Sequence, residues 1–305
     1  MSKEYLLYSR YVSIQAGSLL LNGLDATFNI EKNLKADPNS CELRIYNLSE
    51  TNRKALQALT NVQVERKAGY AGLVNAKPTP LDTFSADLVS SFGFVAPSAD
   101  SDFRIFKGDV VQIFSQKEGP DWVTTLRTSD GLNSRQKSRV DPKLATFKKS
   151  ATIKDIIKKL FDQVLVDTAA AAKKIASGDI DGVDDTILNS YTTFGEVHTE
   201  IDKHFKKLNV SGFIEDNQLV ILKKGETLGT EAVRLTPDTG LLGSPELSQD
   251  GLLKCVSLIR PEIRLGYQLK VESASFNGTY RIERLSYSGS TFDQEWFVTI
   301  EATPL

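Results

Sequence analysis

The sequence predicts an α+β protein that is mainly β, with two antiparallel β units and a smaller α+β unit between them. Apolar and polar residues alternate with a period of two over much of residues 1–147 and again over residues 229–305. Residues 148–228 instead show the helical spacing of apolar residues, followed by two short alternating segments. A chain of 305 residues is also too long for one ordinary domain, so we expect three parts with these boundaries.

Residues 24–70 predict the order strand, turn, strand, helix, strand. Asp37-Pro38-Asn39 has the chemistry of a turn. Ser49 is expected to cap the short helix. The three strands are expected where apolar residues occupy every second position: 26–31, 41–46 and 62–70.

Two further strands are expected in the first unit, at 104–114 and 122–128, with Gly119-Pro120 as the turn between them. Leu19-Leu20-Leu21 is a candidate for a short buried strand or a turn. Strands at this spacing favour an antiparallel sheet or a small closed barrel. Closure would remove the free strand edges that otherwise pair with other chains.

Residues 71–102 stand apart, because 75–102 are rich in Pro, Ser, Ala and Asp and predict a long surface loop. Two interpretations stay open: a contact arm that orders on assembly, or an insertion without a partner. The apolar residues of the loop favour packing against a neighbouring subunit or tail protein: Phe84, Leu88, Val89, Phe92, Phe94 and Val95.

The middle unit, residues 148–228, carries two helical signatures and then a hairpin. Thr152 and Thr193 each have an acidic residue three positions later, as at a helix N-terminus. Apolar residues then recur on one helical face over 153–164 and 194–208. The expected hairpin consists of two strands and a connecting turn: 210–214, 219–222 and Glu215-Asp216-Asn217.

The second β unit, residues 229–305, opens with a segment interrupted by glycine and proline, at Pro237, Gly240, Gly243 and Pro245. Asn277-Gly278 predicts a hairpin turn, because both residues tolerate positive φ. Four alternating segments predict strands: 252–259, 268–273, 279–288 and 295–302.

The composition of the chain argues against some classes of function. Apolar residues make up 40% and charged residues 25% of the chain, which is typical of a globular protein. The formal net charge of −2 argues against a general nucleic-acid-binding surface, since such domains are usually clearly basic. No apolar run has the length of a membrane span, and no signal peptide is expected over residues 1–20.

The two cysteines, Cys41 and Cys255, lie far apart in alternating apolar segments. This pattern favours two buried small hydrophobic side chains in a reducing compartment. A disulfide and a reactive thiol are the alternatives, although neither cysteine has a CxxC partner or a nearby basic cluster.

The sequence predicts no catalytic, cofactor-binding or metal site. His198 and His204 are six positions apart on a predicted helix, so they face different ways and cannot share a metal as residues four apart can. The acidic run 177–185 fits a calcium loop poorly, because the last loop position lacks the bidentate glutamate. Glu196 and Glu200 share a helix face, but no substrate cleft is indicated around them, so exposed helix charge is the favoured interpretation.

Two other features are interpreted as structural. Trp122 and Trp296 stand singly in alternating strands, as core or interface anchors do. Four lysine doublets of the middle unit favour a solvated helix face, with an acidic partner or phosphate as the alternative: 148–149, 158–159, 173–174 and 206–207.

Several short motifs occur along the chain in a fixed order. The first group is Phe28-Asn29-Ile30-Glu31-Lys32, Pro38-Asn39 and Ile45-Tyr46-Asn47-Leu48-Ser49. Later motifs are Ala68-Gly69-Tyr70, Ile105-Phe106-Lys107-Gly108, Thr128-Ser129-Asp130-Gly131, Thr239-Gly240-Leu241-Leu242-Gly243-Ser244-Pro245, Ile259-Arg260-Pro261, Leu265-Gly266 and Gly278-Thr279-Tyr280-Arg281-Ile282. In this order and wording the chain resembles the tail or baseplate hub proteins of tailed bacteriophages. Residues 71–102 depart from that pattern, where a short connection is expected.

The resemblance implies two antiparallel, tube-like β-barrel domains with a smaller α+β domain between them, and a structural role without catalysis. It implies a homotrimer whose ring adapts a sixfold tail tube to a threefold spike and helps to form the tail channel. The implied partners are tail tube proteins, the central spike, the tape measure and other baseplate proteins, with no membrane and with DNA only in transit. The implied location is the virion tail or baseplate, after assembly in the host cytoplasm.

Two other classes stay open. A tail-associated cell-wall hydrolase would need two positioned carboxylates or a metal in a cleft, and neither is recognisable in the sequence. A β-barrel module that binds oligonucleotide or saccharide would show clustered exposed aromatic residues with basic neighbours.

Overall fold

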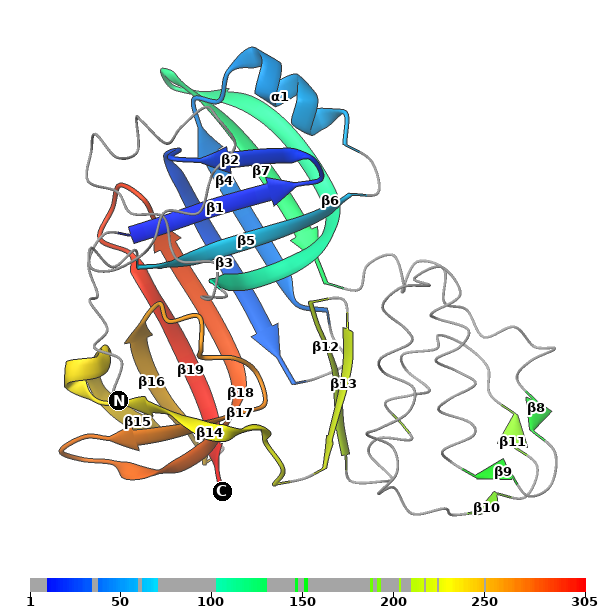
Figure 1. The fold of residues 1–305 in the computed structure, drawn as a ribbon, viewed down its shortest axis with the longest axis vertical. Helices are drawn as coiled ribbons and strands as arrows, with labels where there is room; N and C mark the ends of the chain where they lie inside the picture. Colours follow the sequence, from blue (N-terminus) through cyan, green and yellow to red (C-terminus); the bar gives the residue numbers. More distant parts are fainter. Residues whose placement is uncertain are drawn as a thin grey trace.

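The chain is mainly β, as the sequence predicts (Figure 1). A computed structural model describes residues 10–34, 38–59, 62–70, 103–130, 203, 210–216, 218–223, 225–249 and 251–305, with four two-residue strands besides.

The elements follow one another in chain order through the three predicted parts, and β14 begins at Leu228, the last residue of the predicted middle part. The first part contains β1 (Arg10–Ala16), β2 (Leu19–Asn22), β3 (Ala26–Asn33), β4 (Ser40–Tyr46), α1 (Glu50–Gln57), β5 (Gln63–Tyr70), β6 (Arg104–Glu118) and β7 (Asp121–Ser129). The middle part contains β8 (Thr146–Phe147), β9 (Ala151–Thr152), β10 (Ile187–Leu188), β11 (Tyr191–Thr192), β12 (Val210–Glu215) and β13 (Gln218–Lys223). The last part contains β14 (Leu228–Leu235), the 3₁₀ helix η2 (Pro237–Thr239), β15 (Leu241–Leu247), β16 (Leu253–Leu258), β17 (Tyr267–Glu272), β18 (Asn277–Ser290) and β19 (Trp296–Pro304).

The strands of the two β units form one thirteen-stranded sheet. The main path is β15-β16-β19-β18-β3-β4-β7-β6-β5-β1-β2, and all its neighbours are antiparallel. Off this path, β17 pairs antiparallel with β18 and parallel with β14. The long strand β18 joins the units, because it also pairs with β3 from Arg284↔Asn33 to Ser290↔Thr27.

The core of the first unit lies between two layers of this sheet. In Figure 1, β1, β2 and β5 cross over β3, β4 and β7. Ile14 and Val64 from the first layer and Ile30, Leu43 and Leu126 from the second are all buried in one hydrophobic cluster. The same cluster continues into the second unit, so one core supports both units.

The predicted order of elements over residues 24–70 is confirmed. Ser49 caps α1, because its Oγ accepts a hydrogen bond from Asn52 N at 3.3 Å. Leu56 is the side chain of α1 that is fully buried. The predicted turn between β6 and β7 is also present, with Gly119 at φ 61°.

The prediction of a turn at Asn277-Gly278 is wrong. These two residues open β18, opposite Glu272 and Val271 of β17. The turn comes earlier, where Ser273 Oγ accepts a hydrogen bond from Phe276 N at 2.9 Å. A serine side chain that bonds to the backbone three residues later closes the loop before the asparagine is reached.

The segment interrupted by Gly243 and Pro245 contains a strand that the sequence did not predict. Both residues lie within β15, where the pairing with β16 is interrupted between Leu242 and Glu246. Proline is tolerated there because it lies where the ladder is irregular. Strands β1 and β14 were likewise not predicted.

The hairpin predicted at the end of the middle unit is confirmed as β12 and β13. Thr152, the expected helix cap, ends the short strand β9. Of the predicted helix over 194–208, Lys203 is described and is helical. The rest of that helix, the predicted helix over 153–164 and the predicted loop over 71–102 lie outside the described residues.

Candidate assembly surface

A polar face extends across both β units on the side of the sheet that points away from the core. Residues directly opposite each other in antiparallel strands share a face, so the register identifies its rows. One row runs over five neighbouring strands through Phe297, Ser288, Asn29, Glu42 and Arg127. All five side chains are exposed or half-buried, so the unit boundary does not interrupt this face.

Cross-strand polar contacts cover this face. Arg127 Nε lies 2.8 Å from Glu42 Oε2, and both side chains are about half exposed. Ser286 Oγ donates to Glu31 Oε1 at 2.5 Å between β18 and β3. Exposed ion pairs contribute about 0.2–1 kcal/mol each to the free energy of unfolding. The polar side chains of this face therefore add little to stability and are suited to contact with water.

A shallow groove of about 410 Å³ lies on the same face, where the two units meet. Arg284 Nη1 lies 3.0 Å from Glu301 Oε2 beside it. Its lining is mostly polar and comes from β3, β18 and β19: Glu31, Lys32, Asn33, Arg284, Leu285, Ser286, Thr299 and Glu301.

The eight strands from β15 to β6 end in two strand edges that lack a neighbour among the described residues. Strand β15 pairs with β16 on one side only. Strand β6 pairs with β5 only as far as Asp109, so residues 111–118 have a neighbouring strand on the β7 side alone among the described residues. Exposed apolar side chains lie at both edges, Val111 on β6 and Leu242 and Leu247 on β15. Such edges are templates for pairing with another chain.

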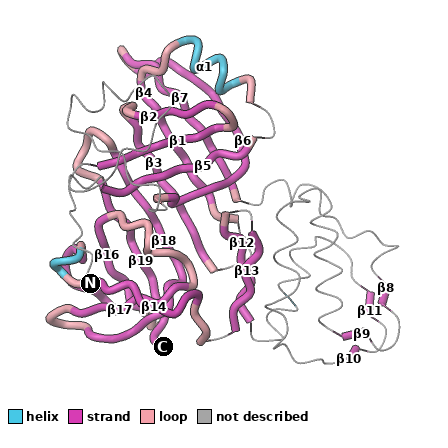
Figure 2. Tube along the Cα trace, viewed as in Figure 1, coloured by secondary structure: helices cyan, strands magenta, loops and turns pink. Residues whose placement is uncertain are grey.

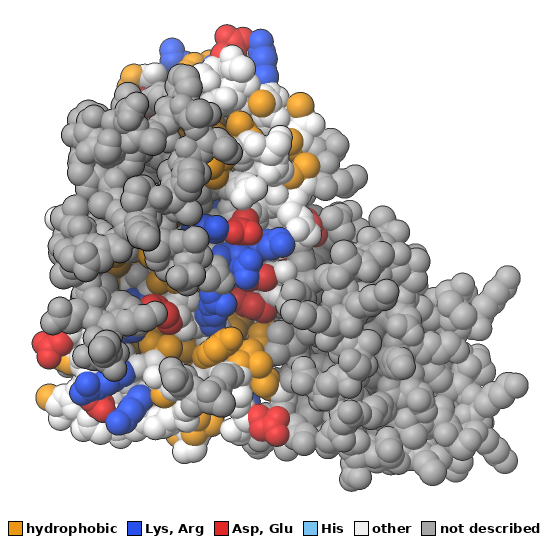
Figure 3. All heavy atoms as spheres, in the orientation of Figure 1, with side chains coloured by type: hydrophobic (Ala, Val, Ile, Leu, Met, Phe, Trp, Pro, Cys, Tyr) orange, Lys and Arg blue, Asp and Glu red, His pale blue; other side chains and the backbone are white. Residues whose placement is uncertain are grey.

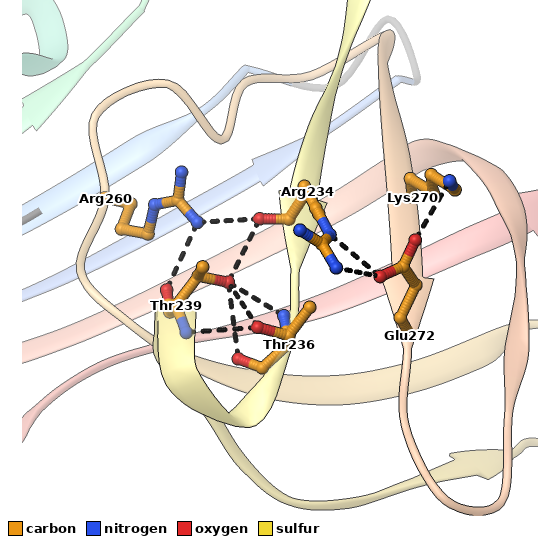
Figure 4. A network of polar contacts seen from close by, with 6 residues as sticks. All are labelled: Arg234, Thr236, Thr239, Arg260, Lys270 and Glu272. Carbon is orange, nitrogen blue, oxygen red and sulfur yellow. Dashed lines mark hydrogen bonds and ion pairs between the residues drawn. The ribbon is translucent and has the colours of Figure 1, made fainter. Parts of the chain in front are cut away.

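A network of polar contacts holds the turn that leads into β15 (Figure 4). Arg260 is buried, and its Nη1 donates to Arg234 O at 2.9 Å and to Thr239 O at 3.2 Å. Thr236 and Thr239 cap η2 reciprocally, since each side chain accepts a hydrogen bond from the backbone N–H of the other. Gly240 ends the turn at φ 106°, a left-handed conformation that favours glycine. The entry to the β15 edge is therefore fixed from several sides.

The same network continues at the surface to Glu272. Its carboxylate forms two ion pairs: Oε1 lies 2.9 Å from Lys270 Nζ, and Oε2 lies 2.6 Å from Arg234 Nη2. Hydrogen bonds from Lys270 and Arg234 lower the pKa of Glu272. The carboxylate thus joins β14 to β17, a parallel pair among the described strands.

Both cysteines are buried and neither is in a disulfide. Burial raises the pKa of Cys41 to about 11 and that of Cys255 to about 12. The nearby Arg66 and Lys32 oppose this effect at Cys41 without reversing it. The interpretation of both cysteines as small buried side chains is confirmed.

The two tryptophans have different roles. Trp296 is a core anchor, buried with edge-on contacts to Phe28 and Tyr70. Trp122 is 40% exposed, and the guanidinium of Arg53 lies over its ring at 4.3 Å. The interpretation of Trp296 as a core residue is confirmed.

The histidines and glutamates weighed for catalysis or metal binding lie outside the described residues, as do the lysine doublets and the acidic run 177–185. This holds for His198, His204, Glu196 and Glu200. In the part of the chain that is described, no three His, Cys, Asp or Glu side chains gather as metal ligands. Within the same ranges, no helix has the length and apolarity needed to cross a membrane.

Sequence reasoning missed Lys32 and Arg66, although a signal was present. Lys32 occupies the same strand face as the buried Phe28 and Ile30, and Arg66 the same face as Val64. Both cations are buried, at 5% and 3% exposure. A charged residue in phase with core residues therefore indicates a buried charge.

The comparisons with known proteins agree with this architecture. A family profile described as baseplate hub gp41 matches residues 10–302. No curated protein matches the chain. Among solved structures, the chain is similar to the 43 kDa tail protein of prophage MuSo2 from Shewanella oneidensis, at 10% identity and a TM-score of 0.60, with 97% of each chain covered.

Two further structures show the same likeness. The tail protein from Neisseria meningitidis MC58 is 11% identical with a TM-score of 0.60, covering 97% of this chain and 96% of that one. An E. coli component of the type VI secretion system, itself similar in structure to T4 bacteriophage tail proteins, is 13% identical with a TM-score of 0.58, covering 96% and 76%. At these identities the likeness is one of fold.

Proposed function

Because the chain belongs to the baseplate hub gp41 family, we propose that three copies form a ring that adapts the sixfold tail tube to the threefold spike. The family is one of structural baseplate proteins, so the chain is a structural tail protein rather than an enzyme, and its place is the tail of the virion. Assembly of the ring in the host cytoplasm, before it joins the virion, is part of the proposal.

The two free strand edges, on β15 and on residues 111–118 of β6, are the observation that supports a ring. Eight strands run without interruption from β15 to β6; among the described residues, β15 has a strand on one side only, and β6 has a strand on one side only over residues 111–118. If the β15 edge of one copy pairs with the β6 edge of the next, the contact is head to tail, and it forms a closed ring of three when the rotation between neighbouring copies is one third of a turn. Closure would remove both edges, which is the usual way in which β proteins avoid uncontrolled pairing.

The presence of two β units in each chain explains how three chains can match a sixfold tail tube. We propose that residues 1–147 and 229–305 act as two similar tube-like barrel domains, with residues 148–228 as the smaller domain between them. Three chains would then present six related units to a sixfold tail tube and a true threefold axis to the central spike. The tape measure and other baseplate proteins are further proposed partners.

The polar face of the eight strands is the proposed channel wall. It is continuous over both units, and its side chains are polar or paired in charge, as for Glu42 with Arg127 and Arg284 with Glu301. A DNA molecule in transit would meet hydroxyls and arginines that are already paired with carboxylates, rather than a surface of unpaired cations, so it would not be held by its phosphates. This fits the formal net charge of −2.

The edges can be tested by substitution. Val111→Lys and Leu247→Lys each place a charge at one proposed contact edge, and each is expected to reduce the trimer fraction in solution or with the spike. Leu20→Lys is the matched control, because Leu20 is similarly exposed and lies on β2, an edge strand at the other end of the sheet that the proposed contact does not use. Equal trimer fractions in all three variants and the parent protein would rule out strand pairing at these edges.

A further inference from the structure

The β12–β13 hairpin is attached to both β units by side chains. Among the described strands, β12 and β13 pair with each other and not with the thirteen-stranded sheet. Figures 1 and 2 place the hairpin beside the end of β3. Phe213 and Leu222 of the hairpin are buried in the core cluster that supports both units.

The tip of the hairpin carries two carboxylates that meet cations of the first unit. Glu215 Oε1 lies 2.6 Å from Lys32 Nζ of β3, and Asp216 Oδ2 lies 2.9 Å from Arg104 Nε of β6. Lys32 is 5% exposed and Glu215 is 17% exposed, so this pair is largely withdrawn from water. Figure 3 shows basic and acidic side chains gathered on the face between the two units.

Two further side chains lie close to this ion pair. Arg264 of the second unit interacts with Glu215, and Tyr287 of β18 lies close to both Lys32 and Glu215. Burial lowers the pKa of Lys32, but Glu215 and Asp216 outweigh burial and raise it. Lys32 therefore stays charged at neutral pH.

The second unit receives the hairpin at Gly266. A Cβ at this position would lie 2.8 Å from Leu222 Cδ1, closer than such atoms approach. Gly266 also has φ +74°, the left-handed conformation that favours glycine. The motif Leu265-Gly266 thus has a physical reason: it makes room for the hairpin. The hairpin consequently contacts the first unit at its tip and the second unit along its side.

We propose that the β12–β13 hairpin is a latch that docks and undocks as one body at the junction of the two β units, whose own arrangement the shared sheet already fixes. Undocking breaks no backbone hydrogen bond of the thirteen-stranded sheet among the described residues. The docked tip also leaves two buried acceptors, Glu215 Oε2 and Asp216 Oδ1, without a hydrogen-bond donor. Each buried acceptor without a donor raises the free energy of the docked state. The difference in free energy between the docked and undocked hairpin is therefore smaller than its buried surface suggests, as is needed for an element that changes between two positions.

The latch goes beyond the proposed ring and does not depend on it, because every contact described lies within one chain. Hydrogen exchange of the full-length protein tests it, with Lys32→Glu, Glu215→Lys and the double variant. Each single reversal is expected to speed amide exchange of the hairpin by roughly tenfold or more, while β18 and β19 change by less than about twofold. The double variant is expected to restore slow exchange in the hairpin.

Two control variants separate undocking of the hairpin from a general effect of charge reversal or from unfolding. The exposed pair Glu50 and Lys54 on α1 can be exchanged in the same way, and hairpin exchange should not change. If the reversals unfold the protein, Glu215→Gln removes the charge and keeps the shape, and it should also speed exchange in the hairpin alone. Uniform acceleration over the whole sheet, no change in the hairpin, or no recovery in the folded double variant would each overturn the latch.

Discussion

The ring of Phe28 lies over the bare backbone of Gly289, its cross-strand partner in the β3–β18 pair that joins the two units. A Cβ at Gly289 would overlap the ring atoms of Phe28. Phe28 is itself buried and makes an edge-on contact with Trp296. The junction between the units is therefore packed around a position that only glycine can occupy.

Gly289→Ala is expected to destabilise the protein by about 1–3 kcal/mol, because the added methyl displaces a buried ring. Phe28→Leu combined with Gly289→Ala should recover part of that loss, since the smaller side chain makes room. Urea unfolding measures both, with Ser288→Ala on the same strand as the control. A Gly289→Ala variant as stable as the parent would show that the junction is not closely packed.

Lys32→Met is expected to lower the free energy of unfolding by about 3–5 kcal/mol, because it leaves Glu215 buried without its counter-charge. Replacing both partners, as in Lys32→Met with Glu215→Met, should restore most of the stability, since a buried pair exchanged for apolar side chains is often neutral. Chemical denaturation of the three variants against the parent checks this. Losses that simply add in the double variant would contradict a coupled buried pair.

The same pair has a defined pH dependence. The pKa of Lys32 is raised in the folded protein, so its contribution to stability is complete below the ordinary lysine value of about 10.4 and is lost as the pH rises through the folded value. The stability difference between the parent and Lys32→Met should therefore be no smaller at pH 9 than at pH 7. A difference that shrinks between these two values would contradict the raised pKa.

Glu272 is expected to make the stability of the protein depend on pH in the acidic range. Its pKa is lowered by Lys270 and Arg234, so its contribution is present above the ordinary value of about 4.3 and is lost as the pH falls through the lowered one. Glu272→Gln should be less stable than the parent at pH 7, and the two should converge on acidification. High salt should reduce the difference, because the group is exposed.

Both thiols should be unreactive in the folded protein. With pKa values of about 11 and 12, Cys41 and Cys255 carry little thiolate at pH 8, and both are shielded from reagent. Mass spectrometry after iodoacetamide treatment should find neither alkylated without denaturant and both alkylated with it. Fast alkylation of either cysteine in the native protein would show that its strand opens.

Local patterns predicted the strands from 26 to 70 because each has one buried face, and alternation reports that directly. The same reasoning failed for β15, where Gly243 and Pro245 mark an irregular ladder rather than the absence of a strand. The strand edges of the candidate surface could not be predicted either. An edge is a property of the whole strand order, which depends on pairings such as β18 with β3 between residues about 255 positions apart.

The buried ion pair shows a different limit. Alternation over Phe28, Ile30 and Lys32 indicates that Lys32 points inward, but nothing local identifies Glu215, which is 183 positions away. Only the docking of the hairpin brings the two charges together. Long-range contacts of this kind are the part of the fold that a single sequence does not encode in its local pattern.

If three copies of this hub protein close into a ring, the molar mass in solution is three times that of the chain. Light scattering coupled to size exclusion should give three times the chain mass of 33.7 kDa for the protein alone or with its spike. A protein that remains a single chain of 33.7 kDa alone, and that also binds its spike without forming a trimer, would contradict the ring.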